Sequence, residues 1–213
     1  MTFLYPNTLK RNMNTNSQQQ ITIPPGYFIK AVKAEYSDYQ EALWRELFQN
    51  SLDAGSTRID VFVNDSGFTF RDNGCGMDRE TLINGMLTLG GTVKGENATG
   101  GFGQAKNLLT LCHKSYIVKT RNLVVDGSGI YFHISEADDY LQGTEYEVIP
   151  DSDFEWSRYT SLQNLKSILV KSDIRNNKGE KVEIFVNKED WSHYRTPVGT
   201  HAAGADIDWC KIY

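Results

Sequence analysis

The apolar positions of this chain change their period several times, which predicts a protein that mixes helices with strands. Between Ser37 and Gly55 the apolar residues recur at helical spacing, with Ser37 or Asp38 available as the N-terminal cap and Gly55 as the stop. Residues 57–63 and 67–71 instead alternate between apolar and polar across an Asn-Asp-Ser-Gly turn. The sequence therefore predicts a helix followed by a β-hairpin.

The same patterns predict further elements along the chain. Asp78 can cap a short helix that runs to about Met86, and Asp126-Gly127 marks a turn between strands. Helices are also predicted over residues 104–112 and 159–170, and strands over 115–120, 123–125, 130–134, 144–149 and 181–186. The expected fold class is therefore α+β, with a mostly antiparallel sheet.

No internal repeat or linker divides the chain. Residues 1–20 are rich in Asn, Gln, Thr and Ser, and they are expected to form a flexible N-terminal arm. Residues 21–190 are expected to form one domain, which starts with the short extended piece Ile21–Ile23 and the turn Pro24-Pro25-Gly26. Residues 191–213 are expected to form a C-terminal tail or edge strand, in which Ile207–Tyr213 is either an edge strand or an arm.

Composition favours a soluble globular protein. The 213 residues are 39% hydrophobic, enough to bury a substantial core. No apolar run is long enough to cross a bilayer, and the polar N-terminus lacks the apolar stretch of a signal peptide. Cys75, Cys112 and Cys210 are odd in number and widely spaced, which favours neither a disulfide framework nor a metal cluster. The expected location is the cytoplasm.

The net charge of the chain limits the classes of binding partner that are expected. A net charge of −5 argues against a protein whose main task is to coat nucleic acid, because that affinity comes largely from Lys and Arg. Eight acidic residues and no basic ones lie between Ser135 and Trp156. This stretch is either a solvated face or a docking surface. Direct nucleic-acid binding and membrane association are therefore not indicated.

The helix that ends at Gly55 carries candidate chemistry. At about 100° per residue, Glu46, Asn50 and Asp53 fall within an arc of roughly 60°, while Trp44 and Phe48 point well away. On an isolated helix such a row is usually a solvated face. Here three further motifs follow in fixed order: residues 71–77 (RDNGCGM), 100–107 (GGFGQAKN) and 143–148 (GTEYEV).

In order and spacing, these motifs resemble the GHKL ATPase superfamily, which includes gyrase B, Hsp90, histidine kinases and MutL. The resemblance covers residues 36–150 well. It implies a two-layer α/β sandwich, the Bergerat fold, in which helices cover one face of a mixed sheet and ATP lies between the helices and a lid. Residues 50–60 and 71–77 look most like MutL, whereas residues 100–103 look more like Hsp90 and the MORC proteins.

The resemblance implies roles for the helix row. Glu46 matches the general base that activates the attacking water, for which it must lie within hydrogen-bond reach of that water. Asn50, one turn later, matches the ligand of Mg²⁺, and an amide oxygen suits this hard cation. Asp53 matches the aspartate of an Asp-Ala pair in the family, which is expected to support the structure of the site rather than to contact the ligand. The implied cofactors are ATP and Mg²⁺.

The resemblance also implies an adenine pocket. Asp72 matches the carboxylate that accepts a hydrogen bond from the exocyclic amino group of adenine, which would discriminate against bases without that donor. Gly74 and Gly76 form a turn that lets the backbone approach a ligand. Gly76 and Met77 would line the base, and Thr144 matches the threonine that bonds the Asp72 carboxylate and a water beside adenine.

The glycine-rich segment between Thr88 and Gly103 predicts a mobile lid, which carries Thr92 and Lys94. It leads into a helix whose free N–H groups suit phosphate. The phosphate-binding residues implied by the resemblance are Gly100, Gly101, Phe102, Gly103, Gln104 and Ala105. Ala105 stands where many relatives have glycine, and Asn107 stands where some have lysine.

These features predict an ATP-dependent conformational switch. ATP and Mg²⁺ close the lid, the closed form pairs with a second copy or a larger protein partner across the N-terminal arm, and slow hydrolysis through Glu46 releases it. The alternatives are a non-hydrolysing nucleotide sensor, a GHKL mimic that regulates a partner, or a structural protein without ligand. Relatives carry a second domain that supplies a lysine to the γ-phosphate. Here a partner, Lys94 or a longer chain would have to supply it.

Overall fold

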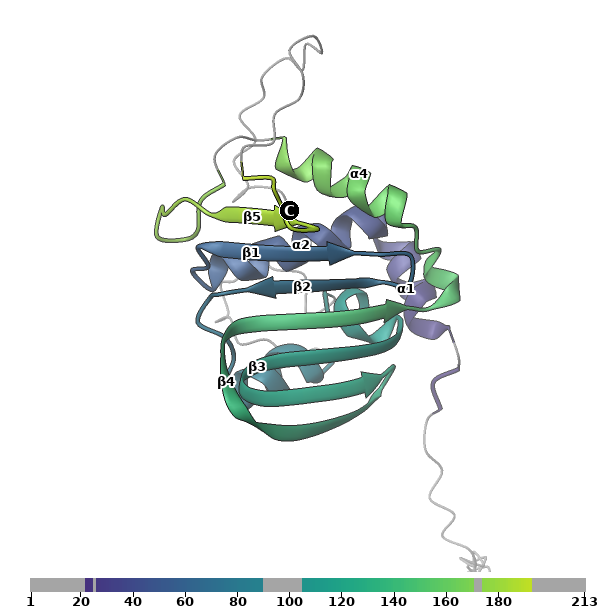
Figure 1. The fold of residues 1–213 in the computed structure, drawn as a ribbon. Coiled ribbons are helices and arrows are strands. Elements are labelled where there is room, and N and C mark those ends of the chain that lie inside the picture. Colours follow the sequence, from purple (N-terminus) through teal and green to yellow (C-terminus); the bar gives the residue numbers. More distant parts are fainter. Residues whose placement is uncertain (1–21, 25, 90–104, 171–173, 193–213) are drawn as a thin grey trace, which may run out of the picture.

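The structure is a computed structural model that describes residues 22–24, 26–89, 105–170 and 174–192 (Figure 1). Within these residues, six strands form one sheet in the order β3-β4-β2-β1-β5-β6. The helices lie on one face of this sheet (Figure 1). The strands are β1 (Arg58–Val63), β2 (Phe68–Asp72), β3 (His113–Ser128), β4 (Tyr131–Pro150), β5 (Glu183–Val186) and β6 (Glu189–Asp190). The predicted α+β two-layer fold is confirmed, and this arrangement is consistent with the Bergerat fold.

The long helix α2 (Tyr39–Asp53) forms where the sequence predicts it. Its N-terminal cap is Asp38, whose carboxylate accepts a hydrogen bond from the Glu41 N–H at 2.8 Å. Gly55 follows the helix with a φ of 74°, a conformation that favours glycine and ends the helix. Local signals therefore set both ends of α2.

A second helix, α1 (Tyr27–Glu35), has no counterpart in the predicted elements. Its N-cap is Gly26, with a φ of 71° and no side-chain hydrogen bond to the helix. The Pro-Pro-Gly sequence signals a turn, whereas the usual Ser, Thr, Asp or Asn cap is missing. Phe28, Ile29 and Val32 nevertheless bury one side of α1, so tertiary packing stabilises it.

The predicted hairpin is confirmed. β1 and β2 pair antiparallel, with Ile59 opposite Asp72 and Val63 opposite Phe68. β1 pairs on its other side with β5, and this pairing is parallel. The chain between β4 and β5 includes the helix α4 (Arg158–Leu169), which is close to the predicted 159–170, and the short 3₁₀ helix η3 (Ser152–Phe154). The sheet is therefore mixed, and mostly antiparallel as predicted.

The predicted strands between residues 115 and 149 are confirmed as strand residues, but they merge into the two long, bent strands β3 and β4. The predicted turn at Asp126-Gly127 is wrong, because both residues lie within β3 and the turn falls at Gly129-Ile130. A Cβ atom at Gly127 would stand 2.2 Å from the ring of Tyr116. Gly127 is therefore needed for close packing inside the sheet rather than for a turn.

Two of the predicted helices take π geometry. Asp78 caps α3 (Arg79–Thr81) as predicted, and the chain continues as the π-helix η1 (Leu82–Leu87). The predicted helix 104–112 is represented by η2 (Asn107–Leu111), also a π-helix. Hydrophobic spacing alone does not distinguish these wider turns from an α-helix, although π-turns often occur at functional sites.

The core lies between the helices and the covered face of the sheet. Trp44 and Phe48 of α2 are buried there, as their positions on the helix predict, and Phe48 packs edge-to-face on Phe70 at 5.4 Å between ring centroids. Val61 and Val118 are also fully buried. Among the described residues, no helix has the length and apolar character needed to traverse a lipid bilayer.

Candidate functional site

The candidate site centres on Asp72, the last residue of β2. Its side chain lies on the covered face and is only 5% exposed. The carboxylate accepts hydrogen bonds from the Gly74 N–H at 2.8 Å, from Ser56 Oγ at 3.1 Å and from Ser51 Oγ at 3.2 Å. The backbone of Thr144, which stands opposite Asp72 on β4, donates a further bond. The strand end thus places a carboxylate beneath α2 and surrounds it with donors.

Burial raises the pKa of Asp72 above its ordinary value, because removal from water disfavours the charged form. The hydrogen bonds from Gly74, Ser56, Ser51 and Thr144 act in the opposite direction. Ser51 also lies 3.0 Å from the backbone oxygen of Leu47. A hydroxyl has one proton, so Ser51 donates either to Leu47 or to Asp72. When it donates to Leu47, one Asp72 oxygen can accept a bond from a ligand.

Gly76 allows the turn after Asp72 to pack closely against β3 and β4. Gly76 has a φ of 64°, and a Cβ atom there would stand 2.8 Å from the Gly143 oxygen and 2.9 Å from Thr120 Oγ1. Thr120 Oγ1 accepts a bond from the Met77 N–H at 2.7 Å and lies 3.3 Å from Thr144 Oγ1. The predicted pocket residues Gly74, Gly76, Met77 and Thr144 are therefore brought together around Asp72.

Glu46, Asn50 and Asp53 lie on α2, the helix that also carries Ser51 of the Asp72 site. Glu46 is half-buried, whereas Asn50 and Asp53 are exposed. Asp53 accepts a hydrogen bond from Gln49 at 2.8 Å, and its backbone oxygen accepts one from Asn177 at 2.7 Å. The first bond lies within α2, whereas the second ties the C-terminal end of α2 to the residues before β5.

Much of the predicted phosphate-binding segment lies outside the described residues. This applies to Thr92, Lys94, Gly100, Gly101, Phe102, Gly103 and Gln104, and to the predicted lid. Ala105 is described and is half-buried at the start of the chain that leads into η2. In the part of the chain that the structure describes, no group of three or more His, Cys, Asp or Glu side chains could hold a metal ion.

Sequence reasoning missed four residues of the site. Ser51 and Ser56 hold the Asp72 carboxylate, and Thr120 joins Met77 to Gly143 and Thr144. The side-chain oxygen of Asn73 accepts bonds from the N–H groups of Thr57 and Arg58, each at 2.9 Å, and so fixes the turn after Asp72. Ser51 and Ser56 stand inside the MutL-like residues 50–60, and Asn73 stands inside residues 71–77, so all three could have been found there. Thr120 has no distinguishing pattern.

The fold and this site define a nucleotide-binding domain of the GHKL type. Residues 36–123 match the family model described as "Histidine kinase-, DNA gyrase B-, and HSP90-like ATPase". The matched segment contains Glu46, Asn50 and Asp72, and the match supports the GHKL ATPase superfamily that the motifs predict.

More specific similarity is to MutL. The chain is 38% identical over 63 residues to the DNA mismatch repair protein MutL of Salmonella arizonae, and 36% identical over the same length to that of Salmonella heidelberg. The matched stretch covers 28% of this chain and 10% of each MutL. The chain thus shares with MutL one segment, which is about a tenth of the length of each MutL.

The described residues fit adenine. Asp72 offers a buried acceptor, and the absence of side chains at Gly74 and Gly76 leaves the turn after β2 free of Cβ atoms that would collide with Ala54, Ser56 or Thr120. For Mg²⁺, Asn50 is an exposed amide on α2, four residues after Glu46, and thus on the same side of the helix. An amide oxygen belongs to the donor set that this cation prefers.

Proposed function

We propose that this domain binds ATP and acts as a Mg²⁺-dependent ATPase switch in the cytoplasm. The observation that carries the proposal is the Asp72 carboxylate, buried beneath α2 and held by donors on both oxygens. A buried carboxyl group is costly unless it serves the fold or a ligand. A ligand amino group at Asp72 explains the combination of burial, nearby glycines and a serine that can release its bond.

In this proposal Asp72 selects adenine, while Gly76 and Met77 contact the base and Thr144 holds a water beside it. Glu46 accepts a proton from the attacking water, and its position on the rigid helix α2 fixes its direction. Asn50 holds Mg²⁺, which when bound neutralises charge on the phosphates and orients them. Thr92, Lys94 and residues 100–105 are proposed to contact the phosphates.

Replacing Asp72 tests the proposal. Asp72→Asn should weaken ATP binding at least about tenfold, because the amide presents a donor where an acceptor is needed. The matched control is Asp60→Asn, the same replacement on β1 at the uncovered face, which should change affinity less than about twofold. Calorimetry with ATP and with GTP measures both. Asp72→Asn should also lose the preference for ATP over GTP, which general unfolding would not produce, and unchanged affinity would remove Asp72 from the pocket.

The second candidate function is a nucleotide sensor or GHKL mimic that binds ATP without hydrolysing it. Glu46→Ala separates the two, because it should abolish phosphate release while leaving ATP binding intact or tighter. Glu41→Ala, a carboxylate about 140° around the same helix, is the control and should retain turnover. Equal background rates in wild type and Glu46→Ala would favour the sensor. Asn50→Ala should instead lose the Mg²⁺-dependent part of binding.

The proposed switch includes assembly, either with a second copy or with a larger partner. ATP would order the predicted lid over residues 88–103, and the predicted arm over residues 1–20 would pack across the partner. Light scattering with an ATP analogue, with ADP and without nucleotide tests the homodimer. A shift from monomer toward dimer with the analogue alone supports it, whereas an unchanged mass in all three conditions favours the sensor or mimic.

A further inference from the structure

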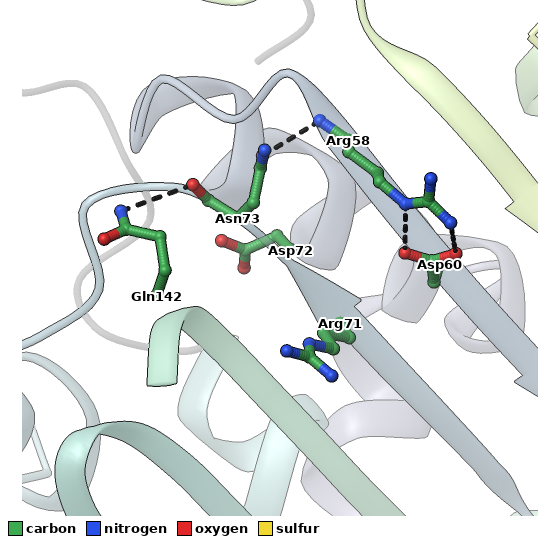
Figure 2. A pocket seen from close by; sticks show the side chains of 6 residues that line it. All are labelled: Arg58, Asp60, Arg71, Asp72, Asn73 and Gln142. Carbon is green, nitrogen blue, oxygen red and sulfur yellow. Dashed lines mark hydrogen bonds and ion pairs between the residues drawn. The ribbon is translucent and has the colours of Figure 1, made fainter. Parts of the chain in front are cut away.

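A hollow of about 340 Å³ lies on the uncovered face of the sheet, behind the turn that follows Asp72 (Figure 2). It is lined by Arg58, Asp60, Arg71, Asp72, Asn73 and Gln142. Its volume is near the lower end of the about 300–1,000 Å³ found for small-molecule pockets. Alternation along β2 places Phe70 and Asp72 on the covered face and Arg71 on this one. Asp72 thus borders the hollow, but its side chain lies on the opposite face of β2 from the side chain of Arg71.

Four of the residues that line the hollow are charged, namely Arg58, Asp60, Arg71 and Asp72. Two guanidinium groups line it, from Arg58 and Arg71, whereas the Asp72 carboxylate is bonded to Ser51 and Ser56 beneath α2. This leaves Asp60 as the carboxylate that faces the hollow. Arg58 holds Asp60 through two bonds of 2.8 Å and also stacks over the Phe185 ring at 4.3 Å. The Arg58 guanidinium group and the Asp60 carboxylate thus neutralise each other in a two-bond ion pair.

Arg71 is the less satisfied of the two arginines. Its contact with Glu145 measures 3.9 Å, and Glu145 already accepts a 2.8 Å bond from Lys119. The Arg71 side chain is 51% exposed. In Figure 2, dashed lines join Gln142 to Asn73, Asn73 to Arg58, and Arg58 to Asp60, while Arg71 stands apart from this chain of bonds. A guanidinium group has five N–H donors, and among the residues that the structure describes most of those on Arg71 have no acceptor within hydrogen-bond distance.

The amide groups of the hollow connect it to the turn after Asp72. The Gln142 side chain donates to the backbone oxygen of Gly74, and Asn73 is bonded to the backbone of Thr57 and Arg58. Each carboxamide therefore has a defined position. An anion bound to Arg71 would lie beside two ordered amides rather than on a bare sheet surface.

We propose that this hollow binds a small organic oxyanion, a carboxylate or a phosphate ester, through the guanidinium group of Arg71. Two parallel N–H groups of a guanidinium fit the two oxygens of a carboxylate or phosphate, which gives both charge and geometry. The remaining volume takes the organic part of the ligand beside Gln142 and Asn73. This site goes beyond the proposed function and does not require nucleotide.

Nuclear magnetic resonance on the full ¹⁵N-labelled chain tests the proposal with citrate and inorganic phosphate as probes, in sodium chloride of matched ionic strength. The Nε–Hε signal of Arg71 and the side-chain amide of Gln142 should shift in a saturable manner with one or both probes. Citrate alone identifies a carboxylate site, and phosphate alone identifies a phosphate site. Shifts that rise linearly, or that chloride reproduces, would overturn the proposal.

Variants tie the response to Arg71. Arg71→Met should weaken probe binding at least about tenfold. Arg71→Lys keeps the charge but lacks the paired N–H donors of the guanidinium group, and it should weaken binding about threefold or more. Lys114→Met removes an exposed positive charge from β3 without touching the partners of Arg71, and it should change binding less than about twofold. Equal binding by wild type and Arg71→Met would refute the site. Because Arg71→Lys tests geometry in a folded, equally charged protein, instability of Arg71→Met cannot imitate the expected pattern.

Discussion

The two faces of β2 show how one short strand meets two different environments. On the covered face, Phe70 is 1% exposed and Asp72 is 5% exposed, and the carboxylate is held by several donors. On the uncovered face, Arg71 is half exposed, and its contact with Glu145 is at the limit of an ion pair. Burial therefore requires a polar group to be fully bonded, whereas exposure lets a charge remain available.

The largest expected difference between the faces concerns aromatic side chains. Phe70→Ala should lower the free energy of unfolding by about 3–5 kcal/mol, because it opens a cavity against Phe48 in the core. Phe62→Ala, on the neighbouring strand but 43% exposed, should cost less than about 1 kcal/mol. Urea denaturation followed by circular dichroism measures both. Equal costs would mean that the uncovered face is not exposed in solution.

The next effect is a pH dependence that comes from the buried His113. A carbonyl can only accept, so the 2.8 Å contact between His113 Nε2 and the Leu108 oxygen places the proton on Nε2. Nδ1 is buried and has no hydrogen-bond partner among the described residues. Burial lowers the pKa of His113 to about 4, despite the bond to Leu108 and the charge of Asp151, which act to raise it.

Because the unfolded chain binds this proton near pH 6.5 and the folded chain only near 4, stability should fall as the pH is lowered through this interval. The loss attributable to His113 is at most roughly 3 kcal/mol. Denaturant midpoints measured between pH 7 and pH 4 give the slope. His113→Phe should flatten it, whereas His133→Gln, an exposed histidine on β4, should leave it unchanged. The same slope in His113→Phe would contradict this origin.

The smallest effect compares polar contacts on the two faces. Ser56→Ala removes a donor from the buried Asp72 carboxylate and should cost about 1–3 kcal/mol of stability. Lys119→Met breaks the exposed bond to Glu145 and should cost about 0–1 kcal/mol. Thermal melting at low and high salt separates them, since only the exposed pair is screened. A strong salt dependence for Ser56→Ala would show that Asp72 is more accessible to ions than its burial indicates.

The parts of the fold that sequence predicts well have short-range causes. Asp38 and Gly55 mark the ends of α2, and alternation marks β1 and β2. Prediction fails where contacts with distant parts of the chain determine the local structure. α1 has no cap residue and depends on burial, and Gly127 resembles a turn glycine although its role is to accommodate Tyr116. Likewise, the motifs predicted Asp72 and Thr144, but they did not predict Ser56, whose hydroxyl reaches Asp72 only because the turn after α2 packs against the end of β2.

The parallel pairing of β1 with β5 has a consequence for how the domain forms. β1 and β2 are adjacent in sequence and can pair early, but Arg58 meets Glu183 and Val61 meets Val186 only after the intervening β3, β4 and α4. Contacts between residues so far apart are slow to form, because a long loop must close first. During synthesis on the ribosome, the edge of β1 therefore remains unpaired until residues 183–186 emerge, and a chaperone that covers exposed strand edges would have its longest opportunity there.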